Sequence, residues 1–310
     1  MLKDKVKNDV VIDPDNIDED TFYKGEIISF GKLTWRRFCK HKLAVAGMII
    51  LGVLVLAVIF APILTPYSFV ETHPEDVVGG QPLPPCQKYI LGTDNLGRDY
   101  LTRLLYGGRT SLLVGFLAVA VSLVIGIPLG CIAGYYGGTV DMIICRIIDF
   151  LNCIPMFFLL LVANMFFPSG IISVVVIIGV FGWCGIARQV RAQFLSLKKQ
   201  EFVQSAIALG FKDKLVIFKH ILPNALMPVV ITATSSVAGA ILYESSLSYL
   251  GLGVQEPIPT WGAMLSKAQI YIRSVPTMAI FPGLLITLVT LSLSFIGDGL
   301  RDALDPRTRL

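Results

Sequence analysis

The sequence predicts an all-α integral membrane protein with six transmembrane helices. Hydrophobic residues make up 54% of its 310 residues and charged residues only 15%, and its mean hydropathy is +0.71. A soluble domain carries about 25% charged residues, so this composition indicates a chain that lies mostly in lipid. The apolar stretches are continuous rather than alternating, which excludes a transmembrane β-barrel.

Four uncharged stretches each have the length of one transmembrane helix, since about 20 apolar residues cross the hydrocarbon core. A fifth stretch, 150–187, is too long for a single crossing, and the turn-forming sequence "FPSG" at 167–170 divides it into two helices. We therefore expect helices near 43–64, 110–134, 142–167, 171–190, 224–246 and 275–297.

The distribution of lysine and arginine predicts that both termini face the cytoplasm. Nineteen of the 26 basic residues lie in 1–42, 188–220 and the C-terminal tail, whereas the two long loops on the other side, 65–109 and 251–273, hold six. The expected organisation is a cytoplasmic tail (1–31), a first helix with an outer loop (32–109), a five-helix core (110–297) with a cytoplasmic loop at 196–223, and a cytoplasmic C-terminal tail (298–310).

The sequence lacks the motifs of the common catalytic and cofactor sites. It has no GxxxxGK[ST] phosphate loop, no HExxH and no GxSxG. Its six cysteines and three histidines form no CxxC or Cys/His cluster, so neither a zinc site nor a disulfide framework is expected. We expect no enzyme activity, no cofactor or metal, and no nucleic-acid partner. The acidic stretch 1–27 lacks the apolar segment of a signal peptide and is expected to be a loosely attached tail.

Charged residues within the expected helices are few. Asp149 and Arg146 are spaced to pair at i, i+3, and Asp149 is interpreted as a structural or inner-gate charge rather than a proton relay. Glu244 is expected at the outer end of the fifth helix. Ion-coupled carriers usually need carboxylates near the midplane of the membrane, and none is expected here, which disfavours that class.

Small residues recur at every fourth position of the second helix and its exit. Such a small-xxx-small ridge allows two helix backbones to approach closely. Packing within this subunit is the favoured interpretation, with an interface between subunits as the alternative. The ridge consists of Ser122, Gly126, Gly130, Gly134 and Gly138.

The stretch 201–224 interrupts the apolar second half of the chain. Phe202, Ala206 and Leu209 fall at i, i+4, i+7 and predict an amphipathic helix. Gly210 is expected to break it before a second, basic segment that Pro223 closes. This arrangement suits docking into the groove of a partner, or an amphipathic helix that only attaches to lipid.

At this point the sequence resembles a known family. "SAIALG" followed by Pro223 resembles the EAA loop of binding-protein-dependent ABC importers, with Gln204-Ser205-Ala206 at the EAA positions and Gly210 as its glycine. It departs from the motif in having Gln204 for Glu, Ser205 for Ala and His220 for Ile. Three further segments resemble the C-type permease of the peptide and nickel branch: "LGTDNLGRDYLTRLLYGGRTSL" (91–112), "SYLGLGVQEPIPTWGAML" (248–265) and "DALDPRTR" (302–309).

The resemblance implies a type I (MetI-like) permease fold in a bacterial or archaeal plasma membrane. It implies a second permease subunit, two ATPase subunits that bind ATP and Mg, and an extracytoplasmic substrate-binding protein as partners. Dipeptides or oligopeptides are the expected substrates, with nickel or another metal chelate as the alternative. Two alternatives from other functional classes remain, namely a secondary carrier without an ATPase and a membrane scaffold or receptor.

The resemblance also assigns roles to single residues. The residues that would couple the chain to an ATPase subunit are Glu201, Phe202, Gln204, Ser205, Ala206 and Gly210. Contacts with the binding protein are expected from topology in the outer loops, at Asp94–Asp99 and Glu256–Trp261.

Overall fold

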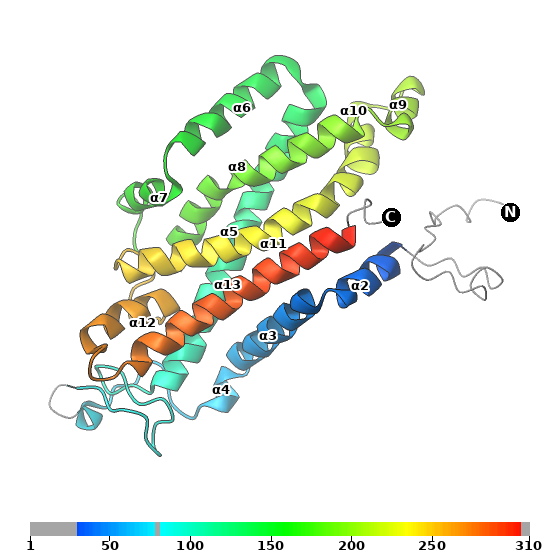
Figure 1. Ribbon diagram of the computed structural model, residues 1–310. Coiled ribbons are helices and arrows are strands. Elements are labelled where there is room, and N and C mark those ends of the chain that lie inside the picture. The colour runs from blue at the N-terminus through cyan, green and yellow to red at the C-terminus, as the bar shows by residue number, and fades with distance from the viewer. Residues whose placement is uncertain (1–29, 78–80, 305–310) are drawn as a thin grey trace, which may run out of the picture.

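The computed structural model describes residues 30–77 and 81–304, and it has no β-strand within those ranges (Figure 1). Five helical segments are long and apolar enough to cross a membrane, and a bent pair adds a sixth if it counts as one span. The expected tail at 1–27 and the last residues of the C-terminal tail lie outside the described residues. The main helices are α2 (Phe30–Lys40), α3 (Lys42–Ile59), α4 (Ala61–Leu64), α5 (Tyr100–Tyr136), α6 (Gly138–Cys153), α7 (Met156–Asn164), α8 (Ile171–Leu197), α9 (Glu201–Ala208), α10 (Asp213–Leu215), α11 (Leu222–Tyr249), α12 (Trp261–Ala268) and α13 (Thr277–Leu304).

The long helices run side by side, so that the bundle has two distinct ends (Figure 1). The loop helix α9 lies at one end with α2 and the last turn of α13. The helix α12 lies at the other, beside the long connection between α4 and α5. We call these the α9 end and the α12 end. The loop at 196–223 and the loops at 65–109 and 251–273, which the sequence assigns to opposite sides of the membrane, thus lie at opposite ends of the bundle.

The third expected helix is bent rather than straight. α6 and α7 meet at 86°, and Ile154 and Pro155 lie between them. Proline disfavours a helical backbone at the residue before it, and Ile154 is extended, with φ −97° and ψ 124°. The expectation of one continuous helix at 142–167 is therefore wrong. The expected turn at 167–170 does separate α7 from α8.

The second helix, α5, begins at Tyr100, well before its expected start at residue 110. The Asp99 carboxylate caps it by accepting a hydrogen bond from the backbone N–H of Thr102 at 2.8 Å. α5 ends at Tyr136, and Gly137 follows it with a φ of +68°, in the left-handed region that favours glycine. Its polar first turns thus belong to the α12 end of the molecule.

The largest buried cluster joins α5, α8 and α11 to α12 and α13. Its completely buried members include Trp261, Ile241 and Val289. By contrast, only 17% of the apolar window of α3 is buried. α3 therefore lies at the edge of the bundle and leaves most of its apolar surface for lipid or a partner.

The glycines of the predicted ridge lie where α5 packs against α8. A Cβ atom added at Gly130 would lie 2.6 Å from the carbonyl oxygen of Ala187. One added at Gly134 would lie 2.5 Å from the Cβ of Phe194. Both distances are too short for real atoms, so these two positions require glycine for the observed approach of the helices.

The rest of the ridge differs along its length. The Ser122 hydroxyl donates a hydrogen bond to the carbonyl oxygen of Gly179 at 2.9 Å, and Gly126 faces Ile186 of α8. Gly138 lies beyond the end of α5, and a Cβ added there would meet nothing within 4 Å. The ridge therefore runs from residue 122 to residue 134 and packs within this chain.

Candidate functional site

The loop at the α9 end consists of two helical pieces with a break between them (Figure 1). Its first piece is α9, which an extended residue, Gln200, separates from the end of α8. Gly210 follows with a φ of +76°, a conformation typical of the glycine that terminates a helix. The chain then enters α10. The helix and the break at Gly210 that the sequence predicts are therefore both present.

α9 packs on its own chain through Val203 and Ala206, which are both buried. The three residues of the expected apolar stripe do not share one face, because Ala206 is buried whereas the side chain of Phe202 is 45% exposed and that of Leu209 is 74% exposed. The inward face centres on the i, i+3 pair at 203 and 206. Leu209 follows the last helical residue, so helical periodicity no longer sets its direction.

The expected coupling residues divide between the surface and the interior. Five of them are exposed, whereas Ala206 faces the interior of its own chain. Gln204 donates a hydrogen bond from Nε2 to the carbonyl oxygen of Lys198 at 2.7 Å, so its amide occupies one of the free acceptors at the end of α8. The exposed residues are Glu201, Phe202, Gln204, Ser205 and Gly210.

The second piece of the loop continues into the next membrane helix without a break. A π-helix, η3 (Val216–Ile221), follows α10 and joins α11 directly, so Asp213–Tyr249 forms one helical segment of 37 residues. Pro223, expected to close the loop, lies instead in the first turn of α11. Because proline has no backbone N–H, the continuous segment lacks one hydrogen-bond donor at this position.

Sequence reasoning missed most of the apolar surface of this loop. Phe211, Leu215 and Phe218 are exposed and are spaced at i, i+4, i+7. The interpretation of "FKDK" only as the start of a basic segment did not identify this apolar pattern. Three exposed cations, Lys212, Lys214 and Lys219, accompany them. We define the loop patch as the exposed apolar side chains of Phe202, Ile207, Leu209, Phe211, Leu215 and Phe218.

At the α12 end, a charge cluster joins the two outer loops. Arg98 lies between Asp94 (Nε to Oδ2, 2.7 Å) and Glu256 (Nη2 to Oε1, 2.8 Å). Arg103 approaches the same two carboxylates at 3.3 and 3.4 Å. The Lys267 ammonium also binds Oε1 of Glu256. Both guanidinium groups are buried, so these contacts satisfy charges that have little access to water.

This cluster changes the expectation for the outer loops. Asp94, Asp99 and Trp261, expected to contact a binding protein, are buried inside the chain. They hold the α12 end together instead, which the topology of the sequence could not reveal. The exposed part of the two expected segments is limited to Leu96, Glu256, Pro257 and Ile258.

Trp261, at the start of α12, fastens the second outer loop to α5. Its indole Nε1–H donates to the carbonyl oxygen of Leu104 at 3.0 Å. A Cβ added at Gly108 would lie 2.6 Å from the indole ring, so the absence of a side chain there makes room for the tryptophan. Thr260 precedes α12 and caps it by accepting the backbone N–H of Ala263.

Glu244 lies near the α12 end of α11 and has no exposed surface. Its carboxylate accepts hydrogen bonds from the hydroxyls of Ser248 at 2.7 Å and Ser245 at 3.3 Å. The hydroxyls of Ser111 and Thr260 are further hydrogen-bond partners. Donors from α5, α11 and the cap of α12 therefore meet on this side chain, which gives it a structural role.

One face of α11 borders two uncharged cavities. The smaller, about 150 Å³, lies between α5, α7, α8 and α11, and its lining includes Ser122, Gly182, Ser236, Gly239 and Tyr243. The larger, about 420 Å³, follows along α11 toward the α12 end and includes Ser245, Ser246 and Tyr249. The α11 residues along the two cavities are all uncharged and comprise serines, small residues, two tyrosines and one leucine.

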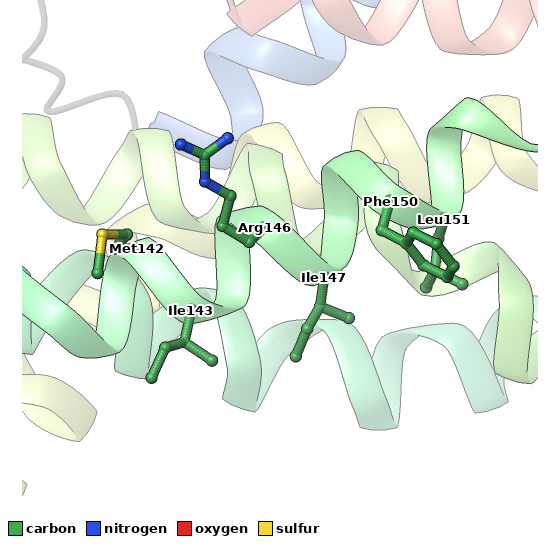
Figure 2. A pocket seen from close by; sticks show the side chains of 6 residues that line it. All are labelled: Met142, Ile143, Arg146, Ile147, Phe150 and Leu151. Atoms are coloured by element: carbon green, nitrogen blue, oxygen red, sulfur yellow. The ribbon is translucent and has the colours of Figure 1, made fainter.

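A third hollow, about 680 Å³, lies along α6 and is almost wholly apolar (Figure 2). Figure 2 shows the Arg146 side chain pointing away from Ile143 and Ile147. The expected pairing of Arg146 with Asp149 is wrong, since Asp149 lies 3.5 Å from Arg188 of α8 on the protein surface. The spacing of residues within one helix could not reveal a partner that lies on another helix.

One group of residues in the described part of the chain could hold a metal ion by geometry alone, namely His73, Glu75 and Asp76. Oδ2 of Asp76 already contacts Lys88 Nζ at 2.6 Å and the hydroxyl of Tyr89 at 2.7 Å. This carboxylate is therefore neutralised by its own chain, which weakens the group as a metal site.

Comparison with known proteins gives two family matches. Residues 126–310 match the family described as binding-protein-dependent transport system inner membrane component. Residues 29–85 match the family described as the N-terminal TM domain of oligopeptide transport permease C. Together the two matches cover most of the chain, including α9 and the whole of α11.

Individual relatives agree with these matches over nearly their full length. The chain is 42% identical over 275 residues to the dipeptide transport system permease protein DppC of Alkalihalophilus pseudofirmus, covering 89% of each. It is 42% identical over 284 residues to the oligopeptide transport system permease protein OppC of Haemophilus influenzae, covering 90% of each. It is 39% identical over 275 residues to the glutathione transport system permease protein GsiD of Pectobacterium atrosepticum, covering 89% of this chain and 90% of that one.

Among solved structures, the fold is similar to that of an inward-facing conformation of the MetNI methionine ABC transporter. The TM-score is 0.53 at 22% sequence identity, and the match covers 66% of this chain and 97% of the other. A second crystal form of the same transporter gives a TM-score of 0.52 at 20% identity. These likenesses show the fold, an all-helical permease bundle.

Proposed function

This chain belongs to the family of binding-protein-dependent transport system inner membrane components, and from this premise we propose that it is one permease subunit of an ATP-driven peptide importer. In this arrangement it forms half of a translocation path. It is not itself an enzyme, and ATP with Mg is bound and hydrolysed in partner subunits.

The loop patch is the observation that carries the proposal. Six large apolar side chains at the α9 end are exposed on the surface of the isolated chain, which is unfavourable in water unless a partner covers them. A short helix that presents such residues is suited to a groove on another protein. Glu201, Phe202, Gln204, Ser205 and Gly210 would lie at this contact with an ATPase subunit, whereas Ala206 supports α9 from behind.

The uncharged face of α11 is the proposed wall of the path. Peptides differ in the charge of their side chains, so a wall that serves many of them gains from small, neutral, hydroxylated residues. Ser236, Gly239 and Tyr243 have this character and lie beside a cavity between four helices. A second permease subunit would supply the facing wall.

Peptides are the substrates that the relatives support. The three described above are named for dipeptide, oligopeptide and glutathione transport. These names favour peptides over nickel or a metal chelate. A secondary carrier is disfavoured because Glu244 is tied to hydroxyls near the α12 end, where it is poorly placed to relay ions across the membrane.

The proposed assembly contains two permease subunits, two ATPase subunits and an extracytoplasmic binding protein in a bacterial plasma membrane. Basic residues concentrate in the segments of the α9 end, which supports a cytoplasmic location for that end and for both termini. The binding protein would then contact the α12 end, at the exposed Leu96, Pro257 and Ile258.

Purification of the tagged chain from its native membrane in mild detergent tests this function. We expect an ATPase and a second permease of similar size to co-purify. Vesicles holding that complex should take up peptides only when ATP and the binding protein are both supplied. Recovery of a chain that transports peptides without an ATPase, or that associates only with lipid through its loop, would contradict the proposal.

A further inference from the structure

One side-chain hydrogen bond joins the second piece of the loop to the end of α5. The hydroxyl of Tyr135 donates to Oδ1 of Asp213 at 2.8 Å. Tyr135 lies one residue before the end of α5, and Asp213 begins α10 shortly after the break at Gly210. Tyr135 is only 6% exposed, so the bond fixes a ring that is already packed on its other sides.

Lys198 adds two contacts to the same tyrosine. Its Nζ donates to the backbone carbonyl of Tyr135 at 2.7 Å, and it lies 5.0 Å from the centre of the tyrosine ring. The backbone carbonyl of Lys198 in turn accepts the amide of Gln204 from α9. These contacts connect the end of α5, the end of α8, α9 and α10. We define the Tyr135 joint as Tyr135, Lys198, Gln204 and Asp213.

An apolar cluster lies alongside the joint. Val203 and Ala206 of α9 and Val216 and Ile217 of η3 belong to one buried group with side chains of α5 and α8. Both pieces of the loop therefore rest on the same two helices. The cluster resists separation of the loop from the bundle, but apolar contacts are non-directional and permit sliding or rotation. Hydrogen bonds are directional, so those of the Tyr135 joint fix the orientation of the loop relative to the bundle.

The helices on the other side of the joint are themselves closely coupled. α5 and α8 approach through Gly130 and Gly134, where no side chain fits between them. Arg191 of α8 also binds Asp141 in the first turn of α6, with Nη2 2.6 Å from Oδ2. A displacement delivered to α5 or α8 at the α9 end is therefore shared by three helices.

We propose that Tyr135 and Asp213 are positioning residues for the coupling of ATP hydrolysis to transport. Their hydrogen bond makes the loop and the ends of α5 and α8 move as one body when an ATPase subunit displaces α9. Without it, the Asp213 end of the segment Asp213–Tyr249 can shift relative to α5, and part of the displacement of α9 is lost before it reaches α5 and α8. This inference rests on the proposed function of the loop.

The test compares Tyr135→Phe with Tyr136→Phe in the complete complex in vesicles. Tyr136 is the adjacent residue, is exposed, and contacts the ring of Tyr135 edge to face, whereas the hydrogen bond to Asp213 comes from Tyr135, so the Tyr136 variant is a matched control. The measured quantity is peptide transported per ATP hydrolysed. A hydrogen bond to a charged group stabilises one arrangement enough that we expect Tyr135→Phe to lower this ratio about fivefold or more, with Tyr136→Phe unchanged.

Two variants of Asp213 separate coupling from a general loss of structure. Asp213→Asn keeps an acceptor oxygen, so the peptide transported per ATP hydrolysed should stay close to the wild-type value. Asp213→Ala should lower this ratio as Tyr135→Phe does. The ATPase should remain bound in all four variants, as measured by co-purification.

The inference is overturned by a Tyr135→Phe complex that transports as much peptide per ATP as the wild type. It is also overturned by equal losses in Tyr136→Phe, or in Asp213→Asn and Asp213→Ala alike. A wild-type complex that shows no ATP-dependent transport, or that contains no ATPase, would instead contradict the proposed function, so the two failures are distinguishable.

Discussion

Nη2 of Arg98 lies 2.8 Å from Oε1 of Glu256 and joins two loops that are 158 residues apart in the sequence. The guanidinium is buried, with 3% of the Arg98 side chain exposed, whereas 41% of the Glu256 side chain is exposed. The buried Asp94 and the partly exposed Glu256 together neutralise this buried cation. The α12 end depends on this contact more than its position near the surface suggests.

The first prediction concerns the pH dependence of this contact. Burial alone would raise the pKa of Glu256, but hydrogen bonds from Lys267 and Arg98 outweigh it and lower the pKa to about 2. Because the folded pKa lies below the ordinary value of 4.5, the stabilisation is full above pH 4.5 and is lost as the pH falls toward 2. Glu256→Gln should therefore lower the thermal midpoint at pH 7 and at pH 5, and this difference should shrink below pH 4.5.

The effect at neutral pH should be modest, about 1 kcal/mol or less, because solvent screens a partly exposed carboxylate. Glu71→Gln in the first outer loop is the control, since Glu71 is exposed, and it should change the midpoint at no pH. If the difference in thermal midpoint between wild type and Glu256→Gln grew as the pH fell, the stabilising role of the ionised Glu256 carboxylate would be contradicted.

The second prediction concerns the packing of α5 on α8. Gly130→Ala places a Cβ 2.6 Å from the carbonyl oxygen of Ala187 and forces the helices apart. Overpacking of this kind costs about 1–3 kcal/mol, so the purified protein should unfold at a lower temperature. Gly185→Ala on α8 has open space for its Cβ and should leave the midpoint unchanged. Equal midpoints for the two variants would argue against close packing at Gly130.

The third prediction separates the outer and inner faces of α9. Leu209→Asp introduces a charge on the exposed loop patch, so it should reduce co-purification of the ATPase about tenfold or more while the chain itself stays folded. Val203→Asp introduces a charge into the buried cluster and should make the loop sensitive to limited proteolysis. If Leu209→Asp bound the ATPase normally, the loop patch would not be the docking surface.

The fourth prediction concerns the break in the loop. Gly210→Val forces a side chain into a backbone with φ +76°, and deletion of 204–210 removes the loop surface itself. Both should abolish peptide transport while leaving the chain inserted in the membrane. Gly31→Val is the control, because its Cβ would meet nothing within 4 Å. Normal uptake by the deleted, inserted chain would refute the coupling role of this loop.

The fifth prediction tests the proposed wall of the path. A Cβ at Gly239 meets nothing within 4 Å, so Gly239→Phe can fill the cavity of about 150 Å³ without a backbone clash. Uptake of peptides with bulky side chains should fall more than uptake of those with small ones. Ile280→Phe on the exposed surface of α13 should change neither. A uniform effect on all peptides would argue against a path along α11.

The sequence predicted where the membrane helices lie but not how two of them begin or bend. Hydropathy did not extend the second helix back to Tyr100, because residues 100–109 include the charged Arg103 and Arg109. Arg103 is neutralised by Asp94 and Glu256, and the contact with Glu256 is tertiary. The bend at Pro155 lies within an uninterrupted apolar stretch, so hydropathy alone showed no boundary there.

The loop was predicted in outline, and its details depend on packing. Gly210 marks a break through its backbone alone, which a sequence displays directly. The direction of Ala206 and Leu209 depends instead on how α9 lies against α8 and on where the helix ends. Likewise, the partner of Tyr135 lies 78 residues away, and no spacing rule connects the two.

The packing of Trp261 against Leu104 and Gly108 has a consequence for the order in which parts of the protein fold during synthesis. The indole and its acceptor are 157 residues apart, so the first turns of α5 are synthesised long before the side chain that covers them. Until α11 has crossed the membrane and brought α12 to the same side, that part of α5 stays uncovered. The α12 end therefore cannot close before residue 261 has been synthesised. A ribosome stalled before that residue would hold a chain that lacks α12 and α13 and whose first turns of α5 are uncovered.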